Sequence, residues 1–125
     1  MLDEEIVLSF VRSAIKSAWS LELLLLLHRD PQRTWTGEAL VRELRGSDSL
    51  VNESLAALTA AGVVETTENG ARYNPRSREL DSLVVALVDL YGQKPIAVLH
   101  TIFTAPSDKI RSFADAFLFR KRSDQ

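Results

Sequence analysis

Hydrophobic residues recur at helical spacing along most of this chain, and near the middle this spacing gives way to a strand-like pattern. Over residues 48–61, Val51, Leu55 and Leu58 stand at the i, i+4, i+7 spacing of one buried helix face. A shorter apolar set predicts a helix over residues 37–44, and a glycine-bearing turn separates it from the next helix. The pattern therefore predicts two helices joined by a short turn.

A two-stranded hairpin is predicted directly after the second of these helices. Gly62 stands where a helix commonly ends in a left-handed residue. The segments 63–66 and 71–73 are β-prone and flank Asn69-Gly70, the dipeptide that best suits a type I′ turn. Residues 34–36 are also short and β-prone, so we expect them to form a small strand that pairs with the hairpin.

Apolar helices are predicted on both sides of this central part. Residues 21–27 are apolar almost all round, so the helix that holds them should be the central element of the core. In the last helix, Phe113, Phe117 and Phe119 form an apolar stripe that precedes a basic run. We interpret this stripe as core or partner surface, with a membrane-surface helix as the alternative. Helices are predicted over residues 2–16, 17–28, 78–91, 95–103 and from 105 onward.

The predicted fold class is mainly α with a small β-hairpin (α+β). At 125 residues, without a linker long enough to separate two domains, the chain is expected to be one domain over residues 1–125. Residues 17–75 are expected to form its central unit, with flanking helices in 1–16 and 78–120. Because the flanking helices carry more apolar surface than a small core can hide, they are predicted to form a homodimer interface.

The residues from about Ser17 to Pro75 resemble the winged helix-turn-helix of bacterial transcriptional regulators such as the MarR and PadR families. The points of likeness are the leucines of 40–44, the turn at 45–47, the run 55–64 and the hairpin at Asn69-Gly70. The resemblance implies a winged helix-turn-helix with extra N- and C-terminal helices. It also implies sequence-specific binding of double-stranded DNA by a homodimer, with one winged helix on each half-site.

The helix over 48–61 would then be the recognition helix, and its outer face would carry the base contacts. Asn52 suits adenine, Glu53 can accept from cytosine N4, and Ala56 can touch a thymine methyl group. Ser49, near the helix N-terminus, can reach phosphate or base. The alternative is that these four are ordinary solvated positions. The predicted DNA-binding residues are Ser49, Asn52, Glu53 and Ala56 on this helix, together with the flanking Arg42, Arg45, Arg72 and Arg76.

Charge raises a difficulty for this interpretation. The recognition helix contains Asp48 and Glu53 but no lysine or arginine, and the chain has a net charge of −2, whereas phosphate neutralisation supplies most non-specific DNA affinity. Arg72 is expected either to enter the minor groove beside the hairpin or to pair with Glu65 or Glu68. The competing function is a winged-helix module that binds a protein. A continuous positive band over the helix and hairpin favours DNA, and a neutral or negative surface favours a protein.

Other function classes find little support in the sequence. The chain contains no Gly-rich phosphate loop, no Gly-x-Ser-x-Gly and no His-Glu-x-x-His, so neither an enzyme nor a cofactor is expected. His28 and His100 are expected to be structural, because no cysteine or second histidine stands at ligand spacing. Trp19 and Trp35 are expected in the core, with a ligand pocket as the alternative. The lack of cysteine and of a membrane-length apolar run suits a cytoplasmic protein.

Overall fold

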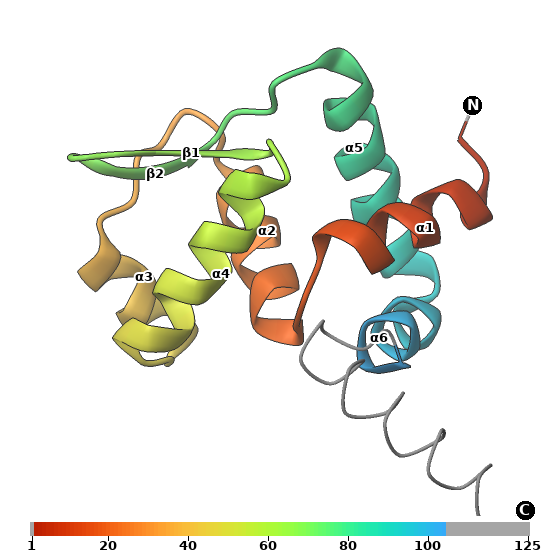
Figure 1. Cartoon of the computed structure of the whole chain (residues 1–125), viewed down its shortest axis with the longest axis horizontal. Helices are drawn as coiled ribbons and strands as arrows, with labels where there is room; N and C mark the ends of the chain where they lie inside the picture. The colour runs from red at the N-terminus through yellow and green to blue at the C-terminus, as the bar shows by residue number, and fades with distance from the viewer. Residues whose placement is uncertain (1, 105–125) are drawn as a thin grey trace, which may run out of the picture.

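The computed structural model describes residues 2–104 of the chain and is mainly helical, with a small two-stranded antiparallel sheet (Figure 1). This confirms the predicted α+β class. The helix expected from residue 105 onward lies outside the described residues. The elements are α1 (Glu4–Ala14), α2 (Ala18–Arg29), α3 (Gly37–Leu44), α4 (Asp48–Ala60), β1 (Val64–Thr67), β2 (Gly70–Tyr73), α5 (Arg78–Gln93) and α6 (Pro95–Thr104).

Short polar side chains fix where most of these helices begin. Each capping residue accepts a hydrogen bond, through its side-chain oxygen, from the backbone N–H three residues further on, at 3.0–3.2 Å. Such a cap stabilises a helix by about 1 kcal/mol, since it satisfies an amide that the helix itself cannot. The capping residues are Asp3 for α1, Ser17 for α2, Thr36 for α3, Ser47 for α4 and Ser77 for α5.

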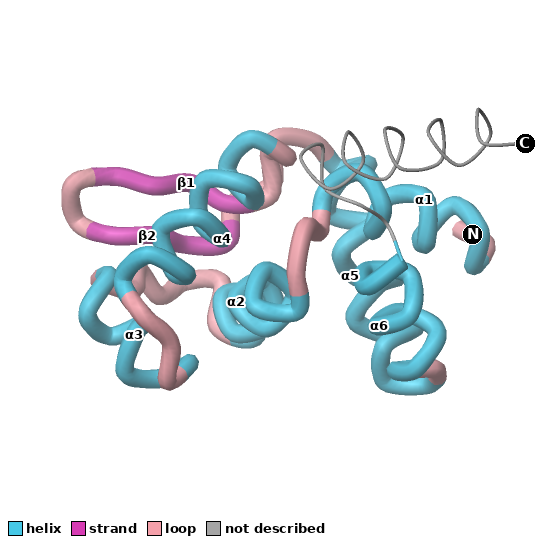
Figure 2. The backbone as a smooth tube through the Cα atoms, turned by 60° about the horizontal axis from the view of Figure 1, so that its bottom comes forward, coloured by secondary structure: helices cyan, strands magenta, loops and turns pink. Residues whose placement is uncertain are grey.

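The leucine-rich helix α2 is the centre of the core, as its sequence predicts. Leu21, Leu23, Leu24 and Leu27 are fully buried, and α2 contacts α3, α4, β2 and α6. Figure 2 shows α2 between two groups of elements, with α3, α4 and the hairpin on one side and α1, α5 and α6 on the other. Because burial of one leucine contributes about 1.5–3 kcal/mol, this helix holds the two groups together.

The hairpin forms near the predicted corner, but with a different turn. Thr67 pairs with Gly70, so Glu68 and Asn69 span the turn, and neither has a positive φ. The predicted type I′ turn at Asn69-Gly70 is therefore wrong, because that turn requires positive φ at both central residues.

Position 70 must be glycine because a third segment of chain lies against it, and not because of the turn. Trp35 and Ala71 exchange two backbone hydrogen bonds of 2.8 Å, so the segment 34–36 pairs with the hairpin as predicted, but through an isolated bridge at Trp35 rather than a strand. A Cβ atom on Gly70 would lie 2.1 Å from the backbone oxygen of Trp35, and the φ of Gly70 is +135°. Only glycine fits where the two backbones approach this closely.

Two left-handed residues shape the ends of α3 and α4. Gly62 has φ +82°, and the Val63 N–H donates to the oxygen of Leu58 at 3.2 Å, which is the Schellman pattern expected after α4. In the turn between α3 and α4 the left-handed residue is Arg45, at φ 54°, rather than the neighbouring Gly46. Gly46 lies against the partly buried ring of Trp19.

The helices α1, α5 and α6 pack against one another and leave some large apolar side chains exposed. Ile6, Val85, Ile96 and Phe103 are between 48% and 75% exposed. No single helix within residues 2–104 is long and apolar enough to cross a membrane. Only α5 and α6 taken together reach that length and apolarity, and the pair is bent by 113°.

Candidate partner-binding face of α4 and the hairpin

One face of the helix α4 packs against the rest of the protein, and the opposite face is exposed to solvent. Val51, Ser54 and Leu58 are buried, and α4 contacts α2, α3 and β1. The outer positions predicted from the helical wheel, Ser49, Asn52, Glu53 and Ala56, are all exposed. The spacing of the inward-facing residues thus predicted the outer face correctly.

A groove runs between α4 and the hairpin. Of the predicted contact residues, Asn52, Ala56 and Arg76 line it together, whereas Ser49, Glu53, Arg42, Arg45 and Arg72 are not among its lining residues. The groove is lined by Trp35, Thr36, Gly37, Asn52, Leu55, Ala56, Thr59, Ala60, Thr66, Thr67, Glu68, Asn69, Gly70, Ala71 and Arg76.

The groove also includes residues that the sequence prediction did not select. Thr59 continues the stripe of Asn52 and Ala56 at i, i+4, i+7, so the helical period alone would have found it. Trp35 was expected in the core, and it is 6% exposed, but it also lines the groove. Trp35 Nε1 and Thr59 Oγ1 are buried and make no hydrogen bond with the described residues.

Arg72 is occupied by an ion pair within the hairpin. Its Nε donates to Glu65 Oε2 at 3.2 Å, and its Nη2 lies 3.2 Å from the same oxygen. Asn74 Nδ2 also donates to that oxygen, at 2.8 Å. The bond from Asn74 first, and then Arg72, lower the pKa of Glu65. Pairing with Glu65, one of the two predicted alternatives, is therefore the arrangement found.

Arg72 also points away from the groove. Successive side chains of a strand alternate between its two faces, and the neighbouring Ala71 is buried and lines the groove. The Arg72–Glu65 pair thus lies on the outer face of the hairpin.

Arg76 is positioned by the end of α4. Its backbone N–H donates to the oxygen of Gly62 at 2.8 Å. Its side chain passes so close to Gly62 that a Cβ atom there would lie 3.2 Å from Arg76 Cδ. Arg76 is therefore held beside the groove at the C-terminal end of α4.

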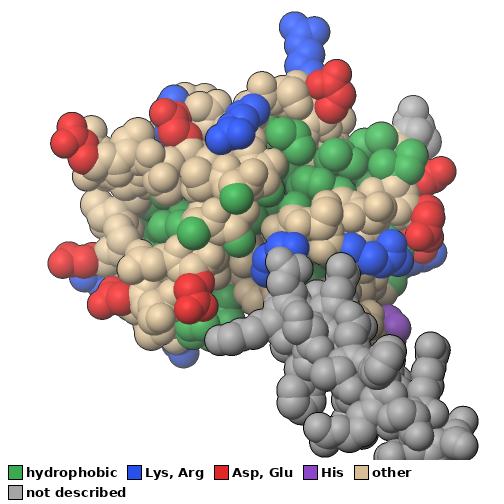
Figure 3. All heavy atoms as spheres, in the orientation of Figure 1, with side chains coloured by type: hydrophobic (Ala, Val, Ile, Leu, Met, Phe, Trp, Pro, Cys, Tyr) green, Lys and Arg blue, Asp and Glu red, His purple; other side chains and the backbone are tan. Residues whose placement is uncertain are grey.

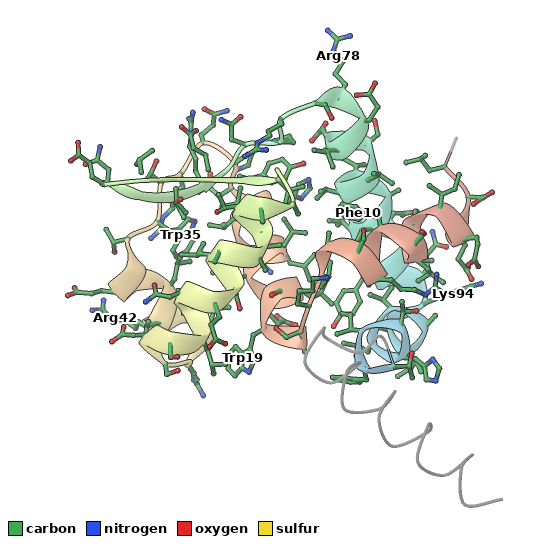
Figure 4. All side chains as sticks on the ribbon, in the orientation of Figure 1. Phe10, Trp19, Trp35, Arg42, Arg78 and Lys94 are labelled. Atoms are coloured by element: carbon green, nitrogen blue, oxygen red, sulfur yellow. The ribbon has the colours of Figure 1, made fainter. Side chains whose placement is uncertain are left out.

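The charges around α4 do not form a continuous positive band. Arg42 and Arg45 are exposed on α3 and its C-terminal turn, and Figure 4 shows Arg42 on α3, away from the hairpin. Between them and Arg76, the exposed charges on α4 are Asp48 and Glu53. In Figure 3 the surface over α4 is mostly uncharged, with acidic and basic side chains scattered at its edges.

Arg33 does not complete such a band. Its guanidinium stacks on the ring of Trp35, 3.5 Å from the ring centroid. Arg33, like Arg72, already contacts another side chain of the protein. An arginine stacked on an aromatic ring nevertheless keeps its charge. The exposed face of α4 is therefore mostly uncharged, with both acidic and basic residues around it.

The two histidines show no sign of a metal site. His28 packs edge-on against Tyr73, with ring centroids 4.9 Å apart, and His100 is exposed. Within residues 2–104 no group of three histidine, cysteine, aspartate or glutamate side chains is placed to hold a metal ion. The contact of His28 with Tyr73 gives that residue a packing role.

Comparison of the chain with protein families, with curated proteins and with solved structures finds no match. The resemblance to MarR and PadR regulators therefore stays a prediction that rests on the residues of this chain alone.

Proposed function

We propose that residues 17–75 form a winged helix-turn-helix, and that the chain is a regulatory module which binds a partner protein through the groove between α4 and the hairpin. The observation that carries this proposal is the composition of the groove. Its lining combines Leu55, Ala56 and Ala60 with uncharged polar residues, and its charged members are Glu68 and Arg76.

The order and pairing of the central elements support the winged-helix assignment. The sequence α2–α3–α4–β1–β2 places two capped helices directly before a hairpin, and Trp35 adds a third paired segment at the edge of β2. The helix that follows the turn presents its exposed face beside the hairpin, which is how a helix-turn-helix presents its recognition helix.

The charges favour a protein partner over DNA. A DNA-binding protein gains affinity by neutralising phosphates with lysine and arginine, commonly at about 6–10 positions. Here α4 carries Asp48 and Glu53 and no basic residue, and Arg72 is engaged by Glu65. An apolar, weakly charged segment of a partner protein can bury the alanines of α4 without leaving phosphates beside those carboxylates.

Double-stranded DNA is the second candidate, because exposed arginines stand at both ends of the exposed face of α4. Arg42 and Arg45 lie on the side of α3, and Arg76 lies beside the end of α4. Asn52 is exposed between them and suits adenine. In this arrangement two copies of the chain would each read one half-site, as the resemblance implies.

Photo-crosslinking in living cells separates the two candidates. A benzoylphenylalanine placed at Ala56 would report on the groove, and the same residue at Glu22, exposed on α2, would serve as the matched control. We expect a discrete crosslinked protein from position 56 and none from position 22. Recovery of DNA fragments from position 56, with no protein above the control, would reject the protein-binding proposal in favour of DNA.

A further inference from the structure

A second groove lies between α1 and α5, on the opposite side of α2 from the hairpin. Its apolar members include Ile6 and Val85, which are 48% and 50% exposed. In Figure 3 hydrophobic side chains gather over α1 and the adjoining part of α5.

Carboxylates dominate the charged rim of this groove. Glu4, Glu79, Asp81 and Asp89 line it, against the single cation Arg78. Lys94 bonds to Glu4 at 2.8 Å, which leaves the three carboxylates of α5 as the main charge along the groove. An occupant that fits must therefore combine an apolar face with basic residues.

This charge argues against two copies meeting groove to groove. In a two-fold interface each patch faces its own copy, so the carboxylates of α5 would face the same carboxylates across the interface. Like charges placed opposite one another in an interface cost several kcal/mol. The homodimer predicted for the flanking helices is therefore not the best occupant of this groove.

We propose that the groove between α1 and α5 binds the chain's own C-terminal segment, residues 105–125. Its sequence places Ile110, Phe113 and Phe117 at the i, i+3, i+7 spacing of one helix face. Its basic residues outnumber its acidic ones. The segment contains Lys109, Arg111, Arg120, Lys121 and Arg122 against Asp108, Asp115 and Asp124.

The path of the chain fits this occupant. The helix α6 contacts both α1 and α5, and its described residues end at Thr104, so the segment continues from a helix that packs against both walls of the groove. A helix of 21 residues is about 30 Å long, and the 16 residues of α5 span about 24 Å. The segment is therefore long enough to follow the groove.

The docked segment would also lie next to the link between α5 and the hairpin. Asp81 lines the groove and accepts a hydrogen bond from the Tyr73 hydroxyl at 2.7 Å. A basic residue of the segment that approaches Asp81 would compete with that bond. Binding of the segment in this groove would thereby weaken a contact of β2, which lies on the other side of α2.

Paired cysteines in the 125-residue chain test the proposal, because these residues include no cysteine. Val85→Cys is combined with Phe113→Cys in one chain and with Phe117→Cys in another. The matched control replaces Val85→Cys by Ser49→Cys, which is exposed on α4. A disulfide needs the two Cα atoms within about 7 Å, so mild oxidation should form an intramolecular disulfide several-fold faster in at least one Val85 pair than in its control.

Charge reversal gives the second arm of the test. Glu79→Lys with Asp89→Lys should slow disulfide formation, and Arg120→Glu with Lys121→Glu in the same chain should restore it, because complementary charges are recreated. Rates equal to the Ser49 controls would overturn the proposal. Disulfide-linked dimers in place of the intramolecular product would assign the groove to a second copy, and an unchanged rate on charge reversal would overturn the role of the carboxylates.

Discussion

The hydroxyl of Tyr73 donates a hydrogen bond to Asp81 Oδ1 at 2.7 Å, and this bond joins β2 to α5. The ring of Tyr73 is buried and packs against His28 of α2. One side chain thus connects the hairpin, the central helix and the helices that follow. The position of the hairpin beside α4 depends on this contact as well as on the sheet.

Tyr73→Phe should destabilise the fold by about 1–3 kcal/mol, because a hydrogen bond to a carboxylate is lost and Asp81 keeps its charge. Chemical denaturation measures this change in the free energy of unfolding. Tyr91→Phe is the matched control, since Tyr91 is only partly buried and should tolerate the loss of its hydroxyl. Equal effects of the two substitutions would show that the Tyr73–Asp81 bond contributes nothing to stability.

Stability should fall at high pH through the same tyrosine. Burial, and then the bond and the charge of Asp81, raise the pKa of Tyr73 above the usual value near 10. A group with a raised pKa in the folded state stabilises the protein fully below its unfolded-state pKa, and this contribution is lost as pH rises above it. The free energy of unfolding should therefore decline above pH 10, and less steeply in Tyr73→Phe. Parallel curves for the two proteins would contradict this.

Gly70→Ala should destabilise the fold by more than about 2 kcal/mol, because the new methyl group would overlap the backbone oxygen of Trp35 and φ +135° is strained for alanine. Gly92→Ala is the control: nothing lies within 4 Å of a Cβ there. Gly92 is within α5, so alanine should stabilise by about 0.5–1 kcal/mol. Thermal unfolding of both variants measures the contrast, and a neutral Gly70→Ala would show that the Trp35 bridge is absent.

Arg45→Gly should stabilise the fold by up to about 1 kcal/mol, because Arg45 has the left-handed φ of 54° that costs a side-chain-bearing residue about 1–2 kcal/mol. Arg42→Gly, in the regular part of α3, should instead destabilise by about 1 kcal/mol. Denaturant titration distinguishes the two. If Arg45→Gly destabilised as much as Arg42→Gly, the side chain of Arg45 would be making a stabilising contact.

Helix boundaries and the outer face of α4 were predictable because they depend on local signals. The caps Thr36 and Ser47, and the i, i+4, i+7 spacing of Val51, Leu55 and Leu58, each act within a few residues of chain. The hairpin turn was mispredicted for a non-local reason. Trp35, more than 30 residues earlier in the chain, bonds to Ala71 and requires glycine at position 70, so Gly70 does not show where the turn falls.

The partner of Arg72 depends on the same turn. A turn at Asn69-Gly70 would place Arg72 opposite Thr67, whereas the turn at Glu68-Asn69 places it opposite Glu65. Register follows from turn geometry, so the sequence alone left both roles of Arg72 open. The weak charge of the groove could not be predicted either. It depends on where the side chains of Arg33, Arg72 and Arg76 lie, and the hydrophobic pattern of the sequence does not determine that.

The most direct test of the proposed function measures how much partner protein is crosslinked in cells from a benzoylphenylalanine at Ala60, which lines the groove. In an Ala56→Asp background we predict a loss of about tenfold or more, since a carboxylate buried against an apolar partner costs more than about 1.4 kcal/mol. In an Arg42→Ala, Arg45→Ala background we predict an unchanged yield. Loss of crosslinking in the arginine variant, with Ala56→Asp unaffected, would contradict the assignment of the groove as the binding site.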